Sequence, residues 1–330
     1  MKQLRIGQTG PLVSALGYGA MSFTDFYGKT DEATSHAILD ACVDFGITHV
    51  DTSNVYGQGR SETFIGSWLA KRGDNPFKIA TKAGIVRGDD GRNHFNNQPE
   101  QLEADLDGSL ARLGVERVEL FYIHRRDQAI PIEEVAGFLG TLIEKGKIGA
   151  FGFSEIAPTS LRRANAEHPV AAVQSEYSLQ TRSPELGLAQ SCAELGATLV
   201  AFSPVGRGLL TDLPPSAEKA AGIAFLKGNP RFIEPNISAN LEKSAAFQAL
   251  AADLAIPAAG LAIAWLLHQG DHVLPIPGTR SVARLQELVD GANRTLSAEE
   301  LTRIEEVLPI GWCHGDRYSV AQWNGPERYC

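Results

Sequence analysis

The chain has 330 residues, of which 43% are hydrophobic and 21% are charged, which is the composition of a folded globular protein with a large core. Its formal net charge of −9 argues against a general binder of nucleic acid or of anionic membranes. No apolar run reaches the roughly 18 residues that a membrane span needs, and the first five residues lack the apolar stretch of a signal peptide. We therefore expect a cytoplasmic protein with neither nucleic acid nor membrane as a partner.

The four cysteines argue against a metal or redox site. Cys42, Cys192, Cys313 and Cys330 lie far apart in the sequence and form no C-x-x-C pair. This spacing makes a zinc site or a redox-active pair an unfavoured interpretation, and no metal is expected. Buried free thiols in a reducing compartment are the expectation.

Short apolar or β-branched runs alternate along the chain with segments of helical spacing. Before them, residues 3–14 contain Gly7, Gly10 and Pro11, which predicts a small β-hairpin ahead of the main fold. The predicted strands are 16–20, 47–50, 77–81, 118–123, 148–153, 171–174, 198–202 and 273–276. The predicted helices are 31–43, 61–71, 99–113, 132–144, 159–166, 185–194, 241–254, 258–268 and 282–288.

Eight strands with helices between them predict a (β/α)8 TIM barrel, formed by residues 1–330 as a single domain. Most of the strands are continuous apolar runs, as expected where helices cover one face and the barrel interior covers the other. A doubly wound sheet is the alternative, and it would carry G-x-G-x-x-G after its first strand. Here Gly17 and Gly19 are followed by Ser22 at the third position, and no helix follows at once. We therefore reject that fingerprint, and the barrel is the simpler closure of the pattern.

Two segments fall outside the repeating pattern. Residues 205–240 form a long connection, which is typical of a lid or a binding segment. Residues 309–330 form a tail that contains four aromatic residues, Trp312, Tyr318, Trp323 and Tyr329. We expect the tail to dock near the active face of the barrel or on a second subunit, which leaves a homo-oligomer open.

Four side chains with acid–base chemistry stand at or just past predicted strands, namely Asp51, Tyr56, Lys82 and His124. In a β/α barrel, such positions meet at one face. A phenol has a pKa of about 10, and a neighbouring lysine ammonium is expected to lower it. Asp51 alone could cap a turn and Tyr56 alone could simply pack, but the set together predicts proton delivery to a carbonyl oxygen. The hydride for such a reduction requires a nicotinamide cofactor.

Seven short motifs at the predicted strand ends occur in one order: Asp51-Thr-Ser-Asn-Val-Tyr56-Gly, Ala80-Thr-Lys82, Tyr122-Ile-His124-Arg, Gly149-Ala-Phe-Gly-Phe-Ser154, Gln174-Ser-Glu-Tyr177, Phe202-Ser-Pro-Val-Gly-Arg-Gly208 and Ile276-Pro-Gly-Thr-Arg280. In these motifs the chain resembles the aldo-keto reductase superfamily over essentially its whole length. The resemblance implies that Tyr56 is the general acid, that Lys82 and Asp51 tune it, and that His124 orients a small carbonyl substrate.

The resemblance also implies contacts to NADPH. Ser154 and Gln174 match positions that hold the nicotinamide carboxamide, and Phe202 matches a stacking position that is commonly Tyr in the family. Arg280 and Arg284 match positions that grip the 2′-phosphate, for which a guanidinium is well suited. The full set of implied cofactor contacts is Gly19, Ser154, Gln174, Phe202, Ser203, Gly206, Arg207, Gly208, Gly278, Arg280, Arg284 and Glu287.

Two departures from the family pattern bear on the cofactor and on the surroundings of Ser154. Leu288, next to the predicted adenine contact Glu287, and Glu155, next to Ser154, both stand where the family often has Asn. Because the Leu288 side chain cannot form a hydrogen bond, one adenine contact of the family pattern, and some cofactor affinity with it, is not expected here; NADPH is predicted to be favoured over NADH.

Substrate contacts are predicted at Met21, Phe23, Tyr27 and Arg125, together with the aromatic residues of the tail. Arg125 directly follows His124. If its side chain faces the pocket, a polar or anionic carbonyl substrate is favoured. The alternative for Arg125 is a salt bridge at the surface.

Two other functions stay open at this point. The β-subunits of voltage-gated potassium channels resemble the same family, so a non-catalytic NADP-binding partner subunit is one alternative. The other is a metal-dependent barrel hydrolase that uses His49, Asp51 and His124. Such barrels usually carry H-x-H at a strand end, whereas this chain has His49-x-Asp51.

Overall fold

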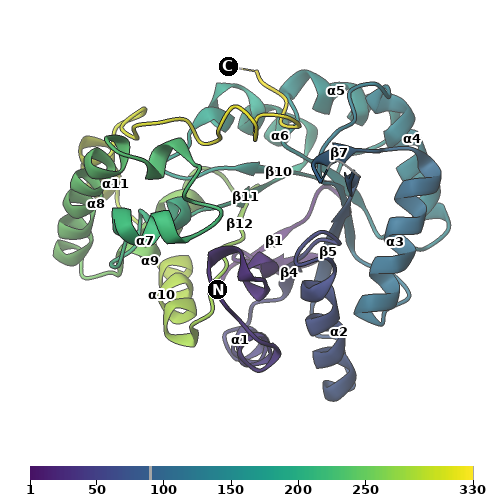
Figure 1. The fold of residues 1–330 in the computed structure, drawn as a ribbon, viewed down its shortest axis with the longest axis horizontal. Helices are drawn as coiled ribbons and strands as arrows, with labels where there is room; N and C mark the ends of the chain where they lie inside the picture. Colours follow the sequence, from purple (N-terminus) through teal and green to yellow (C-terminus); the bar gives the residue numbers. More distant parts are fainter. Residues whose placement is uncertain (89–90, 330) are drawn as a thin grey trace.

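A closed barrel of eight parallel strands lies at the centre of the computed structural model, which describes residues 1–88 and 91–329 (Figure 1). The strands are β3 (Tyr18–Gly19), β4 (His49–Asp51), β5 (Lys78–Ala83), β8 (Leu120–Ile123), β9 (Phe151–Ser154), β10 (Ala172–Glu176), β11 (Thr198–Phe202) and β12 (Val273–Pro275). The sheet runs from β12 to β3, and two backbone hydrogen bonds of 2.9 Å join these edges, from Gly17 N to Pro275 O and from Gly19 N to Pro277 O. The predicted (β/α)8 barrel is confirmed.

Alternate residues of a strand pack into two different cores. On β8, Phe121 and Ile123 belong to the core between strands and helices, whereas Leu120 and Tyr122 belong to the core inside the barrel. Because both faces are covered, the strand is apolar throughout. This explains why continuous apolar runs predicted these strands correctly.

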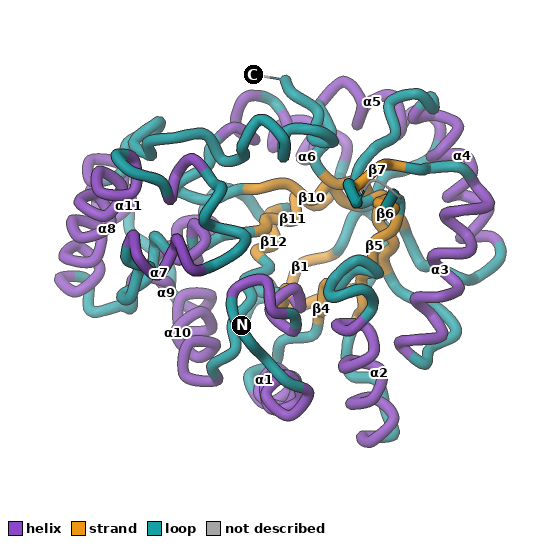
Figure 2. Tube along the Cα trace, viewed as in Figure 1, coloured by secondary structure: helices purple, strands orange, loops and turns teal. Residues whose placement is uncertain are grey.

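Helices surround the barrel, as the purple ring around the orange strands in Figure 2 shows. In chain order they are α1 (Glu32–Asp44), α2 (Arg60–Arg72), α3 (Pro99–Leu113), α4 (Ile132–Glu144), α5 (Pro158–Glu167), α6 (Leu188–Leu195), α7 (Ala217–Gly222), α8 (Asn236–Asp253), α9 (Ala258–Leu267), α10 (Val282–Asn293) and α11 (Ala298–Val307).

The N-terminal hairpin closes one end of the barrel. Strands β1 (Gln3–Arg5) and β2 (Leu12–Ser14) pair antiparallel, as predicted. Leu4, Ile6 and Val13 pack into the interior core, and Gly7 N donates to Thr198 Oγ1 at the amino end of β11. The opposite end, where the strands finish, is therefore the end at which a site can open.

Several elements differ from the sequence prediction. The helix predicted over 185–194 is interrupted by Gly187, whose φ of 118° separates η3 (Ser183–Leu186) from α6. Helix α10 continues to Asn293, and α11 was not predicted. A second unpredicted feature is the hairpin of β6 (Ile85–Arg87) and β7 (Asn93–Phe95).

The connection 205–240 is more ordered than its composition indicates. It contains η4 (Gly206–Gly208), α7, η5 (Pro230–Phe232) and the start of α8. Leu209, Leu226 and Phe232 form a small separate core with their neighbours. This core holds the segment together beside the barrel end.

The C-terminal tail docks on the barrel, which confirms that part of the prediction. It crosses from α11 towards α5 and α6 (yellow in Figure 1). Trp312 Nε1 donates to Leu179 O at 2.8 Å, and the Glu327 carboxylate accepts from Arg126 at 2.5 Å and from Ala157 N at 2.8 Å. The tail is therefore fixed at both of its ends.

Two further predictions concern cysteines and membrane spans. Cys42 and Cys192 are buried free thiols and Cys313 is a half-buried one, whereas Cys330 lies outside the described residues. Burial raises the pKa of Cys192 to about 12.

Within residues 1–88 and 91–329, no single helix has both the length and the apolar character to cross a bilayer. Helices α8 and α9 reach that length and apolar character only as a pair, which is bent by 85°.

Candidate active site

A cavity of 1730 Å³ opens where the barrel strands end. Its wall includes residues from the loops after the strands, from the β6–β7 hairpin, from the segment 203–226 and from the tail. Three of the four predicted catalytic residues, Asp51, Tyr56 and His124, line it, and Lys82 lies directly behind Tyr56.

The charged pair of Lys82 and Asp51 lies at the base of this cavity, with Asp51 on the wall and Lys82 buried behind it. β4 and β5 are neighbours in the barrel, so the ends of both strands point to the same place. Lys82 is fully buried, and its Nζ donates to Asp51 Oδ1, to Thr52 O at 2.8 Å and to Tyr56 Oη at 3.4 Å. Asp51 Oδ2 accepts from Gln174 Nε2 at 2.8 Å. The lysine is therefore held between a carboxylate and a phenol.

The pKa shifts follow from burial and from this pairing. Burial lowers the pKa of Lys82, but Asp51 and Tyr56 outweigh burial, so the pKa lies above its ordinary value and the lysine stays charged. Burial raises the pKa of Tyr56 by more than Lys82 lowers it, so the pKa of Tyr56 is above 10. The expectation of a net lowering was wrong because burial is the larger effect. The phenol stays protonated near neutral pH.

His124 lies at the edge of the Tyr56 ring, with 5.7 Å between ring centroids, and its Nδ1 is 3.1 Å from Ser53 Oγ. Burial, together with the charges of Arg125 and Lys82, holds the pKa of His124 well below 6.5. The imidazole is therefore neutral. Sequence reasoning did not single out Ser53, although it lies between Asp51 and Tyr56 in the same motif.

A second part of the cavity wall lies at the amino end of α10. Ser281 caps this helix by accepting from Arg284 N. The Arg280 guanidinium donates to the backbone carbonyls of Tyr27 at 2.8 Å, of Gly28, and of Lys29 at 3.2 Å. The Arg284 side chain is exposed on the wall, and its guanidinium forms no hydrogen bond or ion pair with any described residue. The Arg284 guanidinium and the helix amino end are thus available to an anion, and the charge of Arg280, whose bonded partners are neutral carbonyls, lies beside them.

The predicted cofactor contacts gather in this cavity with one exception. Gly206 is not part of the wall, and a Cβ at this position would lie 2.8 Å from Gln180 Oε1. Gly19 and Gly278 are part of the wall, but they also form the barrel seam, because a Cβ on Gly278 would lie 2.5 Å from Gly19 O. The residues that line the cavity are Gly19, Ser154, Gln174, Phe202, Ser203, Arg207, Gly208, Gly278, Arg280, Arg284 and Glu287.

One side-chain prediction needs correction, that for Phe23, and the predicted loop residue Arg207 can act only through its backbone. Phe23 does not line the cavity: it is fully buried, with its ring 5.3 Å from that of Tyr18, so a substrate contact is wrong for this residue. The Arg207 guanidinium donates to Glu176 and to Arg317 O, so it is not available as a cation for phosphate. Only the backbone of Arg207, with a φ of 54°, can serve the loop as predicted.

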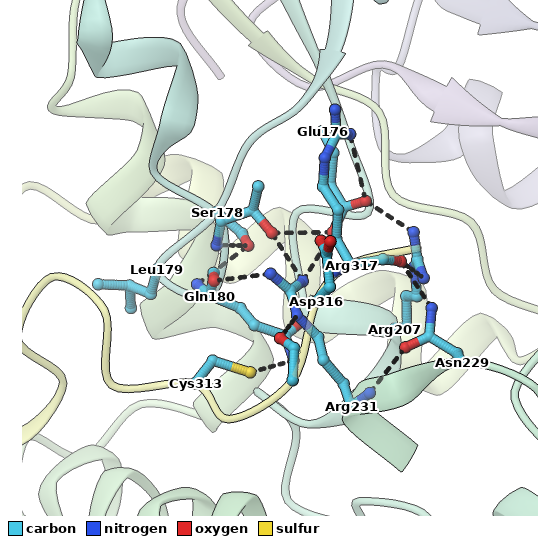
Figure 3. Close-up of polar contacts among 12 residues, drawn as sticks. Glu176, Ser178, Leu179, Gln180, Arg207, Asn229, Arg231, Cys313, Asp316 and Arg317 are labelled. Atoms are coloured by element: carbon cyan, nitrogen blue, oxygen red, sulfur yellow. Dashed lines mark hydrogen bonds and ion pairs between the residues drawn. The ribbon is translucent and has the colours of Figure 1, made fainter. Parts of the chain in front are cut away.

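A buried cluster of charges joins the tail to the barrel end, and Figure 3 shows the part of it around Glu176. We call Glu155, Glu176, Arg207, Arg231 and Arg317 the arginine cluster. Glu176 accepts from Arg207 at 2.6 Å and from Arg231 at 3.0 Å, and Arg317 donates to Glu155. Although burial raises the pKa of both carboxyl groups, the guanidinium groups outweigh it and lower both values. Glu155, a departure from the family pattern, is therefore the partner of a tail arginine.

The arrangement does not suit a metal-dependent hydrolase. His49 Nδ1 is bonded to Lys78 O at 2.9 Å. In the part of the chain that the structure describes, no group of three His, Cys, Asp or Glu side chains is placed to hold a metal ion.

Comparisons with known proteins agree with the geometry. The model of a family described as "Aldo/keto reductase family" matches residues 15–309. An aldo-keto reductase of Schizosaccharomyces pombe, yakc, whose name specifies NADP(+), is 37% identical over 311 residues, which cover 93% of this chain and 92% of that protein. A probable aldo-keto reductase of Glycine max is 36% identical over 330 residues, which cover 100% of this chain and 94% of that protein. Among solved structures, a glycerol dehydrogenase of Gluconobacter oxydans has a TM-score of 0.81 at 27% identity, covering 93% and 94% of the two chains.

Proposed function

Since this chain belongs to the aldo/keto reductase family, we propose that it reduces aldehydes or ketones to alcohols with NADPH, and that Tyr56 donates the proton. The observation that carries the proposal is the contact of 3.4 Å between Lys82 Nζ and Tyr56 Oη at the wall of an open cavity. A protonated phenol beside a buried ammonium can release its proton towards the cavity, because the resulting phenolate would be paired with the cation.

The cavity fits the proposed cofactor. Ser154, Gln174 and Phe202 line it close to the catalytic residues, and Arg280 and Arg284 line it at the amino end of α10. The Arg284 guanidinium has no described partner, which suits it to bind an additional phosphate. In NADPH this group would be the 2′-phosphate, which NADH lacks.

When bound, NADPH supplies the hydride. Tyr56 holds the proton that the carbonyl oxygen requires, and Lys82 stabilises the phenolate that is left behind. Asp51 keeps Lys82 charged and is itself fixed by Gln174. In the tautomer in which Nδ1 accepts from Ser53, neutral His124 carries its proton on Nε2 and can donate a hydrogen bond to the carbonyl oxygen.

The test is to follow NADPH absorbance with a panel of small aldehydes, pyridoxal-like aldehydes, ketones and sugars, each repeated with NADH and with a chelator. We expect absorbance loss with some of the aldehydes, formation of the corresponding alcohol, and no effect of the chelator. Tight NADPH binding without oxidation by any member of the panel would contradict the proposal and favour a non-catalytic binding subunit.

A further inference from the structure

The side chain of Arg125 has a charge that no described carboxylate pairs with. Its Nη1 donates to His124 O at 2.5 Å and to Ser154 Oγ at 3.0 Å, and both acceptors are neutral. Its Nη2 and Nε donate to no described residue. The adjacent Arg126, by contrast, is buried and paired with Glu327 at 2.5 Å. Arg125 is therefore not in the surface salt bridge that was its alternative.

The guanidinium of Arg125 lies on the cavity wall beside the catalytic residues. Its charge contributes to lowering the pKa of His124 and opposes the rise in the pKa of Tyr56. Its stem is enclosed by two segments, because a Cβ on Gly325 of the tail would lie 2.7 Å from the Phe95 ring and 3.2 Å from Arg125 Cδ. The tail and the β6–β7 hairpin thus meet over Arg125 and keep its charge at the cavity.

The protein behind Arg125 does not neutralise this charge. The charge of Arg125 helps to lower the pKa of Glu155, but this carboxylate is already paired with Arg317. In the arginine cluster, three guanidinium groups face two carboxylates, so the cluster itself carries an excess of one positive charge. Arg125 adds a second. This wall is therefore positive in a chain whose net charge is −9.

We infer that Arg125 determines substrate specificity, and that the preferred substrates are aldehydes that carry a carboxylate. This inference rests on the proposed reductase function. The open Nη2 and Nε groups present two parallel donors, which match the two oxygens of a carboxylate. The carbonyl group would then lie at Tyr56 and His124 while the anion is held by Arg125. A neutral aldehyde would leave these donors without a partner in a half-buried place.

The experiment compares matched pairs of substrates, 3- and 4-carboxybenzaldehyde and their methyl esters, by kcat/KM. We expect the wild-type protein to prefer at least one acid over its ester, and this preference to shrink as salt is added. In Arg125→Gln the acid-to-ester ratio should fall about tenfold to a hundredfold, the range for a hydrogen bond to a charged group. Arg125→Lys keeps the charge without the paired donors, so its acid-to-ester ratio should lie between those of the wild type and Arg125→Gln. Arg163→Gln removes an exposed positive charge that does not line the cavity and should keep the wild-type ratio.

A binding measurement separates this inference from the proposed function. Calorimetry with 4-carboxybenzyl alcohol, added to protein saturated with NADP(+), should show binding that weakens in Arg125→Gln by a similar factor. Reduction of the esters with an unchanged ratio in Arg125→Gln would overturn the role of Arg125 and leave the reductase intact. If no aldehyde is reduced, the proposed function fails. The inference about Arg125 then depends on the calorimetry alone, where equal binding by the wild type and the variant overturns it.

Discussion

The molecule buries two sets of charged side chains near the same cavity. Only one of these sets also presents a proton donor to the cavity. In the catalytic set, Lys82 is paired with Asp51, while the Tyr56 ring remains partly exposed to the cavity with its proton in place. In the arginine cluster, Glu176 is enclosed by guanidinium groups and accepts from Thr181 as well. Burial and shifted pKa values mark both sets. A proton that can leave towards the cavity distinguishes the catalytic one.

The two sets also differ in their place in the chain. Asp51 and Lys82 lie at the ends of neighbouring strands, whereas the arginine cluster joins residues from the loop after β9, from β10, η4 and η5, and from the tail. The buried ion pair of the catalytic set consequently depends on two strands of the barrel alone. The arginine cluster connects several segments that are distant in sequence, so we expect it to contribute to stability more than to turnover.

The largest expected effect is on stability. Glu176→Gln leaves Arg207 and Arg231 buried without their carboxylate, which should lower the free energy of unfolding by about 3–5 kcal/mol. Urea denaturation measures this change. Glu133→Gln, which breaks the exposed pair with Arg163, is the matched control and should leave the midpoint nearly unchanged. Equal midpoints for the two variants would show that the cluster does not stabilise the fold.

The converse effect is expected at the catalytic set. Tyr56→Phe removes the proton donor and should lower kcat by at least about a hundredfold, the low end for loss of general acid catalysis. Its urea midpoint and its dissociation constant for NADPH should stay near the wild-type values, because only the hydroxyl is lost. Turnover within a few-fold of wild type would refute the role of Tyr56.

A smaller effect is expected at the far end of the cavity. Arg284→Ala should weaken NADPH binding about tenfold, as expected for one lost hydrogen bond to a charged group, and should change NADH binding much less. Fluorescence titration with the two nucleotides measures both constants. Arg303→Ala, which removes an exposed arginine outside the cavity, provides the comparison. Equal losses for NADPH and NADH would assign Arg284 a packing role.

The smallest effect concerns pH. The folded protein holds the pKa of His124 well below 6.5, so the unfolded chain binds a proton that the folded chain does not. This difference vanishes well above pH 6.5 and grows as the pH falls through 6.5 towards the folded pKa. His124→Gln should therefore reduce the loss of stability in this window, by at most about 1.4 kcal/mol per pH unit. Urea denaturation between pH 7.5 and 5 measures how the free energy of unfolding changes with pH. This dependence would be identical in the wild type and in His124→Gln if His124 were freely protonated in the folded chain.

The sequence predicted the barrel because each strand is apolar on both faces and the helices alternate with the strands. It located Asp51, Lys82 and His124 because strand ends in such a barrel converge on one face. The positions of strand ends could not predict the partners of the Arg207 guanidinium. These partners, Glu176 and Arg317, are distant in sequence and meet Arg207 only after folding. It also does not extend to the pKa of Tyr56, whose direction depends on how deeply the phenol is buried.

The two termini of the chain belong to opposite ends of the barrel, and this matters for handling the protein. Gln3–Arg5 seals the closed end, whereas Tyr318 of the tail belongs to the wall of the cavity. An affinity tag or an immobilisation linker at the amino terminus would therefore keep clear of the reaction chamber. The same attachment at the carboxyl terminus would extend from the tail, which contributes Tyr318 to the wall of the cavity.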